Sequence, residues 1–356
     1  MKGLVLAGGH GTRLRPLTFT GNKHMLPVAN QPVLYYGLRH LAAAGIREVA
    51  VVLGPIPEGV REGVGDGRQF GLSVSYIEQP DPRGLADAVL RAREFLADEP
   101  FVMYLGDNLL QSGVAPFVRA FESGRPDAVI GVSEVEHPER YGVVELGPEG
   151  IRSIEEKPPE PRSRLALIGV YLFSPRIHEV VRDLRPSARG ELEITDAIRR
   201  LWKERGRVTV LHAEGWWKDT GHPGDLLEAN RLVLDSMADD EFRHEGEIRE
   251  GAEVSPRVGL GPGSQIAPGA RIRGPSLLGR DVRVSDDSQV GPHTALGPGV
   301  SLKKASVERS IVLGGSTIEG VHLVDSVIGR NVNIRAQIPM ERAVRLTLGD
   351  SSEVLL

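Results

Sequence analysis

Apolar and polar residues follow two different rhythms along this chain. Over residues 1–238, short apolar runs that suit strands alternate with longer amphipathic segments that suit helices. The pattern predicts strands at residues 3–7, 49–53, 101–105 and 128–135, and helices at residues 32–44, 85–96 and 193–205. Strand signals come closer together between residues 141 and 175. This βαβα order predicts an α/β domain with a mostly parallel sheet and helices on both faces.

From about residue 245, an aliphatic residue recurs at every sixth position. Ten such residues keep one register: Ile248, Val254, Leu260, Ile266, Ile272, Leu278, Val284, Val290, Leu296 and Leu302. The register breaks at Glu308, resumes as Val312, Ile318 and Val324, and shifts again to Ile328 and Ile334. This period is typical of a parallel β-helix, in which each repeat forms one side of a coil and points one aliphatic residue inward. We therefore expect a hexapeptide-repeat domain at residues 245–340 and a cap or tail at residues 341–356.

Composition narrows the class of protein. The chain has 356 residues, of which 40% are hydrophobic and 26% charged, with a net charge of −5 and no cysteine. Disulfides, thiolate metal ligands and a cysteine nucleophile are thereby excluded. The charge does not suit a nucleic-acid-binding protein, and no apolar run approaches the length of a membrane span. No signal-peptide pattern opens the chain, so we expect a cytoplasmic protein without nucleic-acid or membrane partners.

A glycine-rich loop follows directly on the first predicted strand. Residues 6–16 read LAGGHGTRLRP, and residues 22–28 read NKHMLPV. Glycines let backbone N–H groups approach a ligand closely, which suits phosphate binding at the end of a parallel strand. The loop lacks the ending of a P-loop and does not match the dinucleotide fingerprint. Arg13, followed by Lys23 ten residues later, adds the positive charge that a polyanionic substrate requires.

These two stretches resemble the sugar nucleotidyltransferases, and the first domain is similar to the glucose-1-phosphate thymidylyltransferases in particular. The matching stretches span nearly all of residues 1–235: EQP at 78–80, GLA at 84–86, LGDN at 105–108, ERYGVV at 139–144, EEKP at 155–158, GELEITD at 190–196 and WKDTG at 217–221. The hexapeptide tail matches the long members of this superfamily. The resemblance implies a Rossmann-like nucleotidyltransferase domain, with a mixed, mostly parallel sheet, followed by a left-handed parallel β-helix.

The resemblance also implies the reaction. The phosphate oxygen of a sugar 1-phosphate attacks the α-phosphorus of a nucleoside triphosphate in line, and pyrophosphate leaves. Such catalysis is mainly positioning and electrostatic stabilisation. The leading hypothesis is dTTP plus α-D-glucose 1-phosphate giving dTDP-glucose. His24 departs from the pattern, because many thymidylyltransferases carry glutamine there.

The family pattern assigns roles to the residues that bind the nucleotide. Arg13 and Lys23 would bracket the triphosphate and the attacking phosphate. Gln79 would read the edge of the base, since an amide offers both a donor and an acceptor to a pyrimidine imide. The other expected nucleotide-binding positions are Leu6, Gly8, Gly9, Gly11, Thr12 and Gly84.

Two aspartates resemble the family's magnesium ligands. Asp107 follows a predicted buried strand, and Asp219 follows a pair of tryptophans. Mg²⁺ is commonly bound through one or two carboxylates plus water and phosphate oxygens, so this pair suffices. Asp107 has a catalytic role in the same assignment. The alternative roles are a helix N-cap for Asp107 and a turn residue for Asp219.

A second group of residues resembles the sugar-phosphate site. Glu156 would accept hydrogen bonds from sugar hydroxyls, and Lys157 would bind the sugar phosphate. Tyr141 and Gly142 would line the sugar pocket, and Glu193 would contact sugar or ribose. Surface charge for Glu156 and Lys157, and a core position for Tyr141, are the plainer alternatives.

The role of the repeat domain stays open at this point. In the superfamily such domains mediate oligomer contacts and regulation, or they carry an acetyl-CoA-dependent acyltransferase that needs a histidine base. His293 and His322 lie within the coil region. Homo-oligomer contacts are the expected role. The alternative functions are a UTP-using or bifunctional nucleotidyltransferase/acetyltransferase and a non-catalytic regulatory or assembly subunit.

Overall fold

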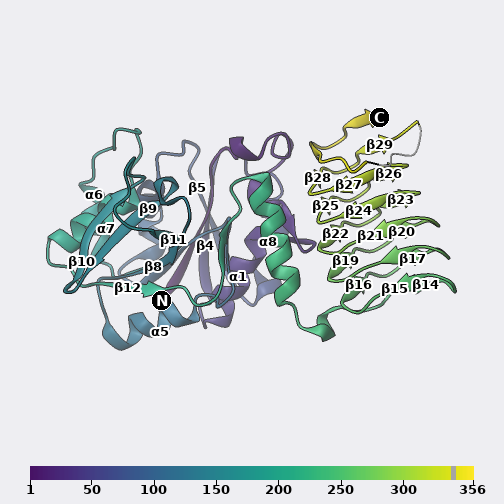
Figure 1. The fold of residues 1–356 in the computed structure, drawn as a ribbon. Helices are drawn as coiled ribbons and strands as arrows, with labels where there is room; N and C mark the ends of the chain where they lie inside the picture. The colour runs from purple at the N-terminus through teal and green to yellow at the C-terminus, as the bar shows by residue number, and fades with distance from the viewer. Residues whose placement is uncertain (338–341) are drawn as a thin grey trace. The chain divides into compact units, whose positions relative to one another are not determined.

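The computed structural model describes residues 1–337 and 342–356, and Figure 1 shows its elements. Two compact units divide the chain. The first comprises Met1–His10 and Val33–Asp219, and the second comprises Gly11–Pro32 and Thr220–Leu356. The expected boundary between the repeat domain and its cap, at residues 340 and 341, lies outside the described residues. None of the described helices is both long enough and apolar enough to span a bilayer.

A mixed sheet forms the centre of the first unit. Its main path runs β10-β9-β11-β6-β1-β4-β5, and β8 pairs with both β11 and β12. Strands β6, β1, β4 and β5 are parallel, whereas β11 runs antiparallel to its neighbours β6, β8 and β9. The strands are β1 (Lys2–Ala7), β4 (Glu48–Leu53), β5 (Ser73–Glu78), β6 (Phe101–Leu105), β8 (Ala128–Glu134), β9 (Gly142–Gly147), β10 (Gly150–Glu156), β11 (Leu165–Phe173) and β12 (Val208–His212). A separate two-stranded sheet pairs β7 (Asn108–Leu110) with β13 (Trp217–Asp219).

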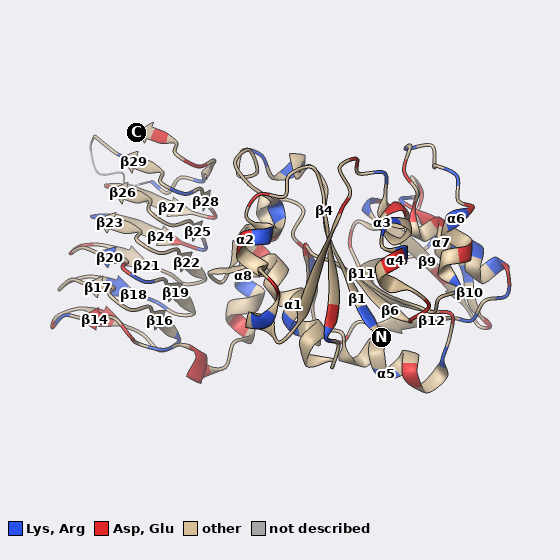
Figure 2. Ribbon diagram, turned by 180° about the vertical axis from the view of Figure 1, so that it is seen from behind, with Lys and Arg blue, Asp and Glu red and all other residues tan. Residues whose placement is uncertain are grey.

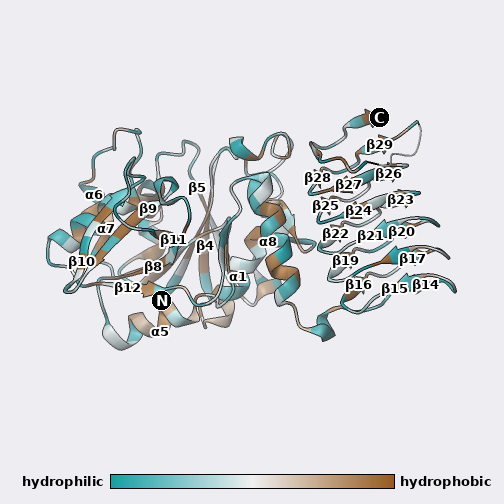
Figure 3. Cartoon of the chain, in the orientation of Figure 1, coloured by the Kyte–Doolittle hydropathy of each residue, from teal (hydrophilic) through white to brown (hydrophobic). Residues whose placement is uncertain are grey.

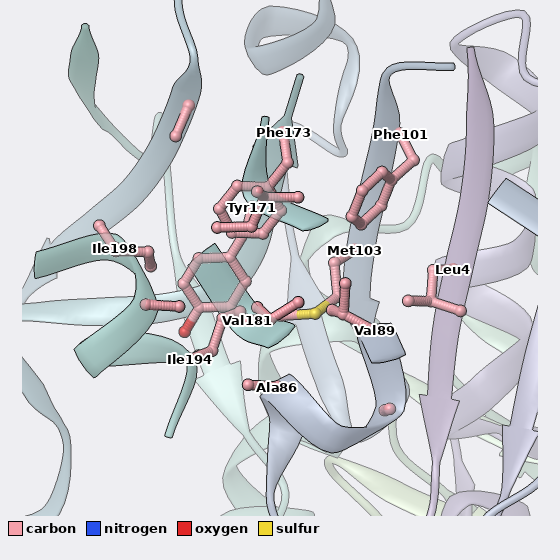
Figure 4. Packing of buried hydrophobic residues seen from close by; sticks show 14 of the residues in the cluster. Leu4, Ala86, Val89, Phe101, Met103, Tyr171, Phe173, Val181, Ile194 and Ile198 are labelled. Atoms are coloured by element: carbon pink, nitrogen blue, oxygen red, sulfur yellow. The ribbon is translucent and has the colours of Figure 1, made fainter. Parts of the chain in front are cut away.

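Helices of the first unit bury the apolar residues of the sheet. Figure 4 shows Leu4, Phe101 and Met103 from the strands packing with Val89 and Ile198 from helices. The helices are α1 (Val33–Ala43), α2 (Val60–Val64), α3 (Leu85–Arg91), α4 (Arg93–Leu96), α5 (Ala115–Gly124), α6 (Ile177–Arg182) and α7 (Ile194–Lys203). The single helix expected at residues 85–96 is therefore two helices, which separate at Ala92.

Short parallel strands stack into three sheets in the second unit (Figure 1), the arrangement of a left-handed parallel β-helix. One sheet runs β14-β17-β20-β23-β26-β29-β31, the next β15-β18-β21-β24-β27, and the third, here called the covered sheet, β16-β19-β22-β25-β28-β30. Their bounds are β14 (Glu247–Ile248), β15 (Glu253–Val254), β16 (Val258–Leu260), β17 (Gln265–Ile266), β18 (Arg271–Ile272), β19 (Ser276–Leu278), β20 (Arg283–Val284), β21 (Gln289–Val290), β22 (Thr294–Leu296), β23 (Ser301–Lys303), β24 (Ser306–Glu308), β25 (Ile311–Val312), β26 (Thr317–Glu319), β27 (His322–Val324), β28 (Val327–Ile328), β29 (Asn333–Arg335), β30 (Thr347–Leu348) and β31 (Glu353–Leu355).

Two inward positions of the coil differ from those that the six-residue repeat predicted. Val307 is fully buried and pairs with Val290 below it, so the repeat continues through the expected break at Glu308 with one residue fewer. In the next turn, Leu323 is fully buried and pairs with Val307, whereas Val324 is half-buried. The inward residue of that side is therefore Leu323. A strict six-residue count misses these positions because a side of the coil can lose one residue at its corner.

The second unit also contains α8 (Pro223–Ser236), η5 (Asp239–Glu241) and the segment 11–32, called here the cation segment because it carries Arg13 and Lys23. Hydrophobic and hydrophilic stretches alternate along α8 (Figure 3), and its buried residues include Leu226, Ala229 and Val233. The cation segment contains only short elements: η1 (Thr12–Leu14), η2 (Lys23–Met25), β2 (Pro27–Val28) and β3 (Gln31–Pro32).

Candidate active site

Loops at the carboxyl ends of adjacent parallel strands gather several of the expected residues. Gly8 and Gly9 follow β1, Gly54 follows β4, and Gln79 follows β5. A methyl group on Gly54 would lie 2.7 Å from Gly8 Cα and 2.7 Å from Gly9 N, so only glycine allows these loops to approach so closely. Open α/β sheets bind ligands at this edge. Leu6 contributes differently, because its side chain lies in the core and its carbonyl accepts a hydrogen bond from Gly106 N.

Gln79 is buried with its amide group held in one orientation. Its Nε2 donates to Gly84 O at 3.1 Å and to Asp87 Oδ2 at 2.8 Å. Both donor hydrogens are thereby used, while Oε1 lies toward Gly8. The amide therefore offers an acceptor to a ligand, which fits the N–H of a pyrimidine imide. The sequence predicted that the Gln79 amide would offer both a donor and an acceptor, but here only its acceptor is available.

Gly84 has a φ of 105° and lies against the backbone of Leu192. A methyl group there would meet Leu192 O at 2.4 Å, so the position requires glycine. Hydrogen bonds from Leu192 N to Arg83 O and from Ala86 N to Leu192 O join this loop to residues 190–193. The base-side loop and the segment that carries Glu193 are thus fixed to each other.

Pairing of β7 with β13 brings the two predicted metal ligands to neighbouring positions. Asn108 lies opposite Asp219 in this ladder, and Asp107 immediately precedes Asn108. Asp107 is almost completely buried, and its Oδ1 accepts a hydrogen bond from Asn108 Nδ2 at 2.9 Å. A strand, not a helix, follows Asp107, so it is not an N-cap.

The chemistry of this pair fits a magnesium ion. Among the residues that the structure describes, no group of three or more His, Cys, Asp and Glu side chains could hold a metal. Two carboxylates are few for a closed structural site but suit Mg²⁺, which keeps water and substrate phosphate oxygens as its other ligands.

Asn108 connects the aspartate pair to the expected sugar residues. Its Oδ1 accepts hydrogen bonds from Trp217 Nε1 at 2.6 Å and from Gly169 N at 3.3 Å. The Trp217 ring packs edge-on against Tyr141, with ring centroids 5.5 Å apart. Tyr141 is only half-buried, so it is not a core residue. A continuous chain of contacts therefore runs from Asp107 to the start of β9.

Carboxylates and one arginine form a compact cluster, here called the acidic cluster, at the end of β10. Glu156 Oε2 accepts a hydrogen bond from Thr195 Oγ1 at 2.6 Å, and its Oε1 lies 3.0 Å from Arg189 Nη1 and 3.8 Å from Lys157 Nζ. The same Arg189 Nη1 lies 3.4 Å from Glu193 Oε1. Glu156 and Lys157 are therefore members of an ordered network, not isolated surface charges.

Gly142 and Glu193 border this acidic cluster. A methyl group on Gly142 would lie 2.9 Å from Thr195 Oγ1 and 3.2 Å from Glu156 Oε2, so the glycine makes room for their hydrogen bond. Burial raises the pKa of the Glu193 carboxyl, and the charge of Glu156 acts in the same direction. Ser187 Oγ donates to Glu193 Oε1 at 3.0 Å, which opposes that shift.

A cavity of about 670 Å³ opens beside the acidic cluster. Glu156, Lys157 and Glu193 all line it, as do Arg189 and Arg199. Charges of both signs lie along α7 and β10, which border the cavity (Figure 2). Its dimensions suit a small polar ligand.

Sequence reasoning missed Arg189 and Gly54. Arg189 directly precedes the GELEITD stretch, and a cation two residues before Glu191 and four before Glu193 is the sequence signal for it. No local pattern marked Gly54, whose role comes from the approach of another loop.

Arg13 and Lys23 lie in the second unit with Gly11 and Thr12. Gly11 has a φ of 60°, and a methyl group there would lie 3.3 Å from Lys23 Cβ, so the two stretches of the motif are packed together. Arg13 Nη1 lies 3.4 Å from His222 Nε2, immediately before α8, whereas Thr12 begins η1 and is exposed. His24 is buried, and its Nδ1 lies 2.6 Å from Asn22 Oδ1, which also caps η2.

The chain passes between the units inside two of the motifs. One crossing follows His10, within the glycine-rich loop, and the other follows Asp219, within WKDTG. The expected residues accordingly form two sets. The set in the first unit contains the base-side loops, the aspartate pair and the acidic cluster, and the set in the second contains Gly11, Thr12, Arg13 and Lys23.

The two coil histidines differ in their surroundings. His293 Nε2 lies 2.8 Å from Asp235 Oδ1 of α8, and its carbonyl accepts a hydrogen bond from Asn230 Nδ2 at 3.0 Å. His293 therefore fastens α8 to the coil. His322 is half-buried at the start of β27.

Comparison with known proteins identifies the family. Residues 2–236 match the model of the nucleotidyl transferase family. A glucose-1-phosphate thymidylyltransferase of Streptomyces antibioticus is 47% identical over 99% of this chain and 99% of its own. Among solved structures, a provisionally assigned glucose-1-phosphate thymidylyltransferase of Bacillus anthracis, in complex with sucrose, matches with a TM-score of 0.62 and 38% identity over 65% of this chain and 95% of that one.

A UDP-glucose pyrophosphorylase complexed with UDP-glucose also matches, with a TM-score of 0.60 and 26% identity over 66% of this chain and 99% of that one. The family model covers most of the chain, and the relative from Streptomyces antibioticus matches through the β-helix as well. The chain therefore belongs to the nucleotidyl transferase family, and it is a sugar nucleotidyltransferase.

Proposed function

We propose that this protein joins dTTP and α-D-glucose 1-phosphate to give dTDP-glucose and pyrophosphate. The observation that supports the proposal is the pairing of β7 with β13, in which Asp219 lies opposite Asn108, the residue that follows Asp107. The substrate choice is supported by the full-length similarity to a glucose-1-phosphate thymidylyltransferase. The bond that forms joins a sugar-phosphate oxygen to the α-phosphorus, and the bond that breaks joins that phosphorus to the bridging oxygen of pyrophosphate.

Asp107 and Asp219 would hold a magnesium ion through their carboxylates. Mg²⁺ supplies neutralisation of charge on the phosphate oxygens when it is bound. The burial of Asp107 and its hydrogen bond from Asn108 keep its carboxylate in one orientation before substrate arrives.

The nucleotide would bind along the glycine loops of the first unit. Gly8 and Gly9 would offer backbone N–H groups to the phosphates, and the Oε1 of Gln79, whose Nε2 is held by Gly84 and Asp87, would accept the imide N–H of the base. This acceptor is common to thymine and uracil, so Gln79 selects a pyrimidine imide without separating dTTP from UTP. Gly84 brings the backbone close enough to flank the base.

Cationic side chains would stabilise the two phosphates that react. Arg13 can form paired hydrogen bonds with phosphate oxygens, and Lys23 acts as a compact positive charge. Their role is to hold two anions together and to stabilise the charge that grows on the α-phosphate oxygens in the transition state.

The acidic cluster would bind the glucose phosphate. Glu156 and Glu193 provide acceptors for sugar hydroxyls, and Lys157 with Arg189 provides positive charge for the sugar phosphate. Tyr141 and Gly142 border the same region. When substrate binds, Arg189 would exchange part of its pairing with carboxylates for pairing with phosphate.

A substrate panel tests the proposal directly. Purified protein is incubated with Mg²⁺, each of dTTP, UTP, ATP, CTP and GTP, and each of several hexose 1-phosphates, and pyrophosphate release is measured. The proposal expects the highest kcat/KM with dTTP and glucose 1-phosphate. Higher kcat/KM with UTP would transfer the assignment to the uridylyl branch, and no release with any pair would overturn the enzymatic proposal.

A further inference from the structure

The cation segment is fastened at two places, Thr20 and Asn30, to other parts of its own unit. It carries Arg13 and Lys23 but holds only two single-turn helices and a hairpin with two-residue strands. Elements this short do not hold their conformation on their own. The positions of the two cations therefore depend on what anchors the segment.

The first anchor joins the middle of the segment, at Thr20, to the last turn of the coil. Thr20 Oγ1 donates to Asp350 Oδ2 at 2.7 Å, and Asp350 Oδ1 accepts from Arg330 N at 2.7 Å. Both carboxylate oxygens of Asp350 are thereby occupied, which fixes the acceptor for Thr20. A methyl group on the neighbouring Gly349 would lie 2.9 Å from Pro16 O, so the coil also approaches the segment closely there.

The second anchor joins the hairpin of the segment to two successive turns of the coil. Asn30 Nδ2 donates to Leu277 O at 3.2 Å and to Leu296 O at 2.9 Å. Ala29 N donates to Asn230 Oδ1 of α8 at 2.9 Å, and Asn230 Nδ2 reaches the coil at His293 O. Asn30 itself has a φ of 59°, a conformation that asparagine tolerates better than most residues.

Hydrogen bonds inside the segment carry the anchors to the cations. Thr18 Oγ1 donates to Gly11 O at 2.8 Å, and this joins the residues near Thr20 to the turn that starts η1 and Arg13. Asn22 Oδ1 accepts from His24 N at 2.9 Å and fixes the start of η2, where Lys23 lies. Movement at either anchor would therefore reach a catalytic cation.

The outward-facing residues of the coil also differ between the sheet that contacts the cation segment and the other sheets. In the covered sheet the outward positions are small or apolar: Gly259, Leu277, Ala295, Ile311 and Val327. All of them are buried except Leu277, which is half-buried. In the sheet that runs from β14 to β31 the corresponding positions are polar or charged: Gln265, Arg283, Ser301, Thr317 and Asn333. The covered sheet is the one whose carbonyls, Leu277 O and Leu296 O, bind Asn30.

We propose that the β-helix positions the cation segment for nucleotidyl transfer, with Asp350 and Asn30 as its positioning residues. The inference rests on the proposed function in one respect, the action of Arg13 and Lys23 on the reacting phosphates. The coil then sets the geometry of the cations without touching substrate. Loosening either anchor lowers the fraction of molecules with the cations in place, so it lowers kcat more than it raises KM.

Replacing Thr20 tests the first anchor. Thr20→Val removes the hydroxyl at constant volume, and Thr20→Ser keeps it. Loss of one hydrogen bond of ordinary strength corresponds to a decrease in kcat of about 2- to 10-fold in Thr20→Val, with little change in Thr20→Ser. Ser352→Ala is the matched control, because Ser352 Oγ donates to Gly349 O, a hydrogen bond within the last turn of the coil itself.

Asn30→Gly tests the second anchor and keeps a residue that accepts the positive φ. The expected decrease in kcat is again about 2- to 10-fold, and larger in the double variant Thr20→Val/Asn30→Gly. Unchanged kcat in both single variants and in the double variant would overturn the proposal, as would an equal decrease in Ser352→Ala.

Hydrogen exchange gives a readout that does not depend on activity. The amides of Leu14, Leu17 and Met25, which bond within the segment, are expected to exchange faster in Thr20→Val and Asn30→Gly, while amides of β22 stay unchanged. If the wild type releases no pyrophosphate with any substrate pair, the proposed function fails, and exchange alone decides the positioning: faster exchange supports it, and unchanged exchange overturns it.

Discussion

The central sheet and the β-helix bury their residues in different ways. Strands β1, β4 and β6 of the sheet are buried along almost their whole length, because helices cover both faces. In the coil, strands such as β17 and β20 bury one residue and expose the next. Gln79 and Asp107 lie just beyond strand ends of the sheet and Glu156 lies at the end of β10, whereas coil corners lead straight into the next strand. The difference teaches that the sheet leaves polar and charged groups at its strand ends, whereas the coil repeats one inward and one outward residue along its strands.

The largest expected effect is a loss of stability of the β-helix. Leu302→Ala removes an inward side chain from a fully buried position, and such cavities cost about 2–5 kcal/mol. The loss is measured as a lower urea midpoint by far-UV circular dichroism. Ser301→Ala, on the outward side of the same strand, should change the free energy of unfolding by under about 0.5 kcal/mol. Equal effects of the two substitutions would contradict the one-sided description of the coil.

Removing one aspartate of the pair should lower activity without lowering the stability of the fold. Asp107→Asn or Asp219→Asn should lower kcat on the order of 10²-fold, by analogy with the loss of one preorganised electrostatic group, which corresponds to about 2.7 kcal/mol. The thermal midpoint should stay close to that of the wild type. Asp286→Asn, on an exposed turn of the coil, is the control and should keep full activity. Near-normal turnover in both site variants would refute the metal role.

Two arginines of the first unit, Arg189 and Arg199, line the same cavity and are expected to respond differently to substitution. Arg189→Gln should raise the KM for glucose 1-phosphate by about 10-fold, since a hydrogen bond from a charged group contributes about 1.5–3 kcal/mol, and should leave the KM for dTTP unchanged. Arg199→Gln is the matched control, because Arg199 lines the same cavity but pairs with Asp196 at 2.6 Å. If both variants changed the two KM values alike, the phosphate role of Arg189 would be lost.

The smallest expected effect concerns a buried histidine under the sheet. Burial lowers the pKa of His178 to about 4, with the charge of Arg93 acting in the same direction. Neither ring nitrogen has a hydrogen-bond partner within the part of the chain that the structure describes. Because the folded pKa lies below the usual value of 6.5, this contribution to stability is complete above pH 6.5 and is lost as the pH falls toward 4.

Urea titrations at pH 7 and pH 5 measure that contribution. Wild-type protein should lose about 1 kcal/mol more than His178→Leu between the two values. Tryptophan fluorescence is the suitable probe, because all 3 tryptophans (Trp202, Trp216 and Trp217) lie in the first unit. The same pH response in both proteins would show that His178 is not responsible.

The sequence by itself determined the elements that repeat or are strongly patterned. The strand at residues 101–105 has the predicted bounds, and ten aliphatic residues at six-residue spacing predicted the coil, because each side of a coil needs one inward side chain. The same local rule could not locate Val307 and Leu323, since a shortened corner changes the count without changing the composition.

Only the tertiary structure decided how the chemical groups are held. Gln79 offers an acceptor because Gly84 and Asp87 take its two donor hydrogens, and Arg189 enters the acidic cluster because a loop returns to the end of β10. The motif glycines predicted a tight loop, but Gly54 acquired its role from contact with Gly8. Asp350 reaches Thr20 across 330 positions of sequence. Such contacts depend on where distant segments pack, and no local pattern of residues encodes that distance.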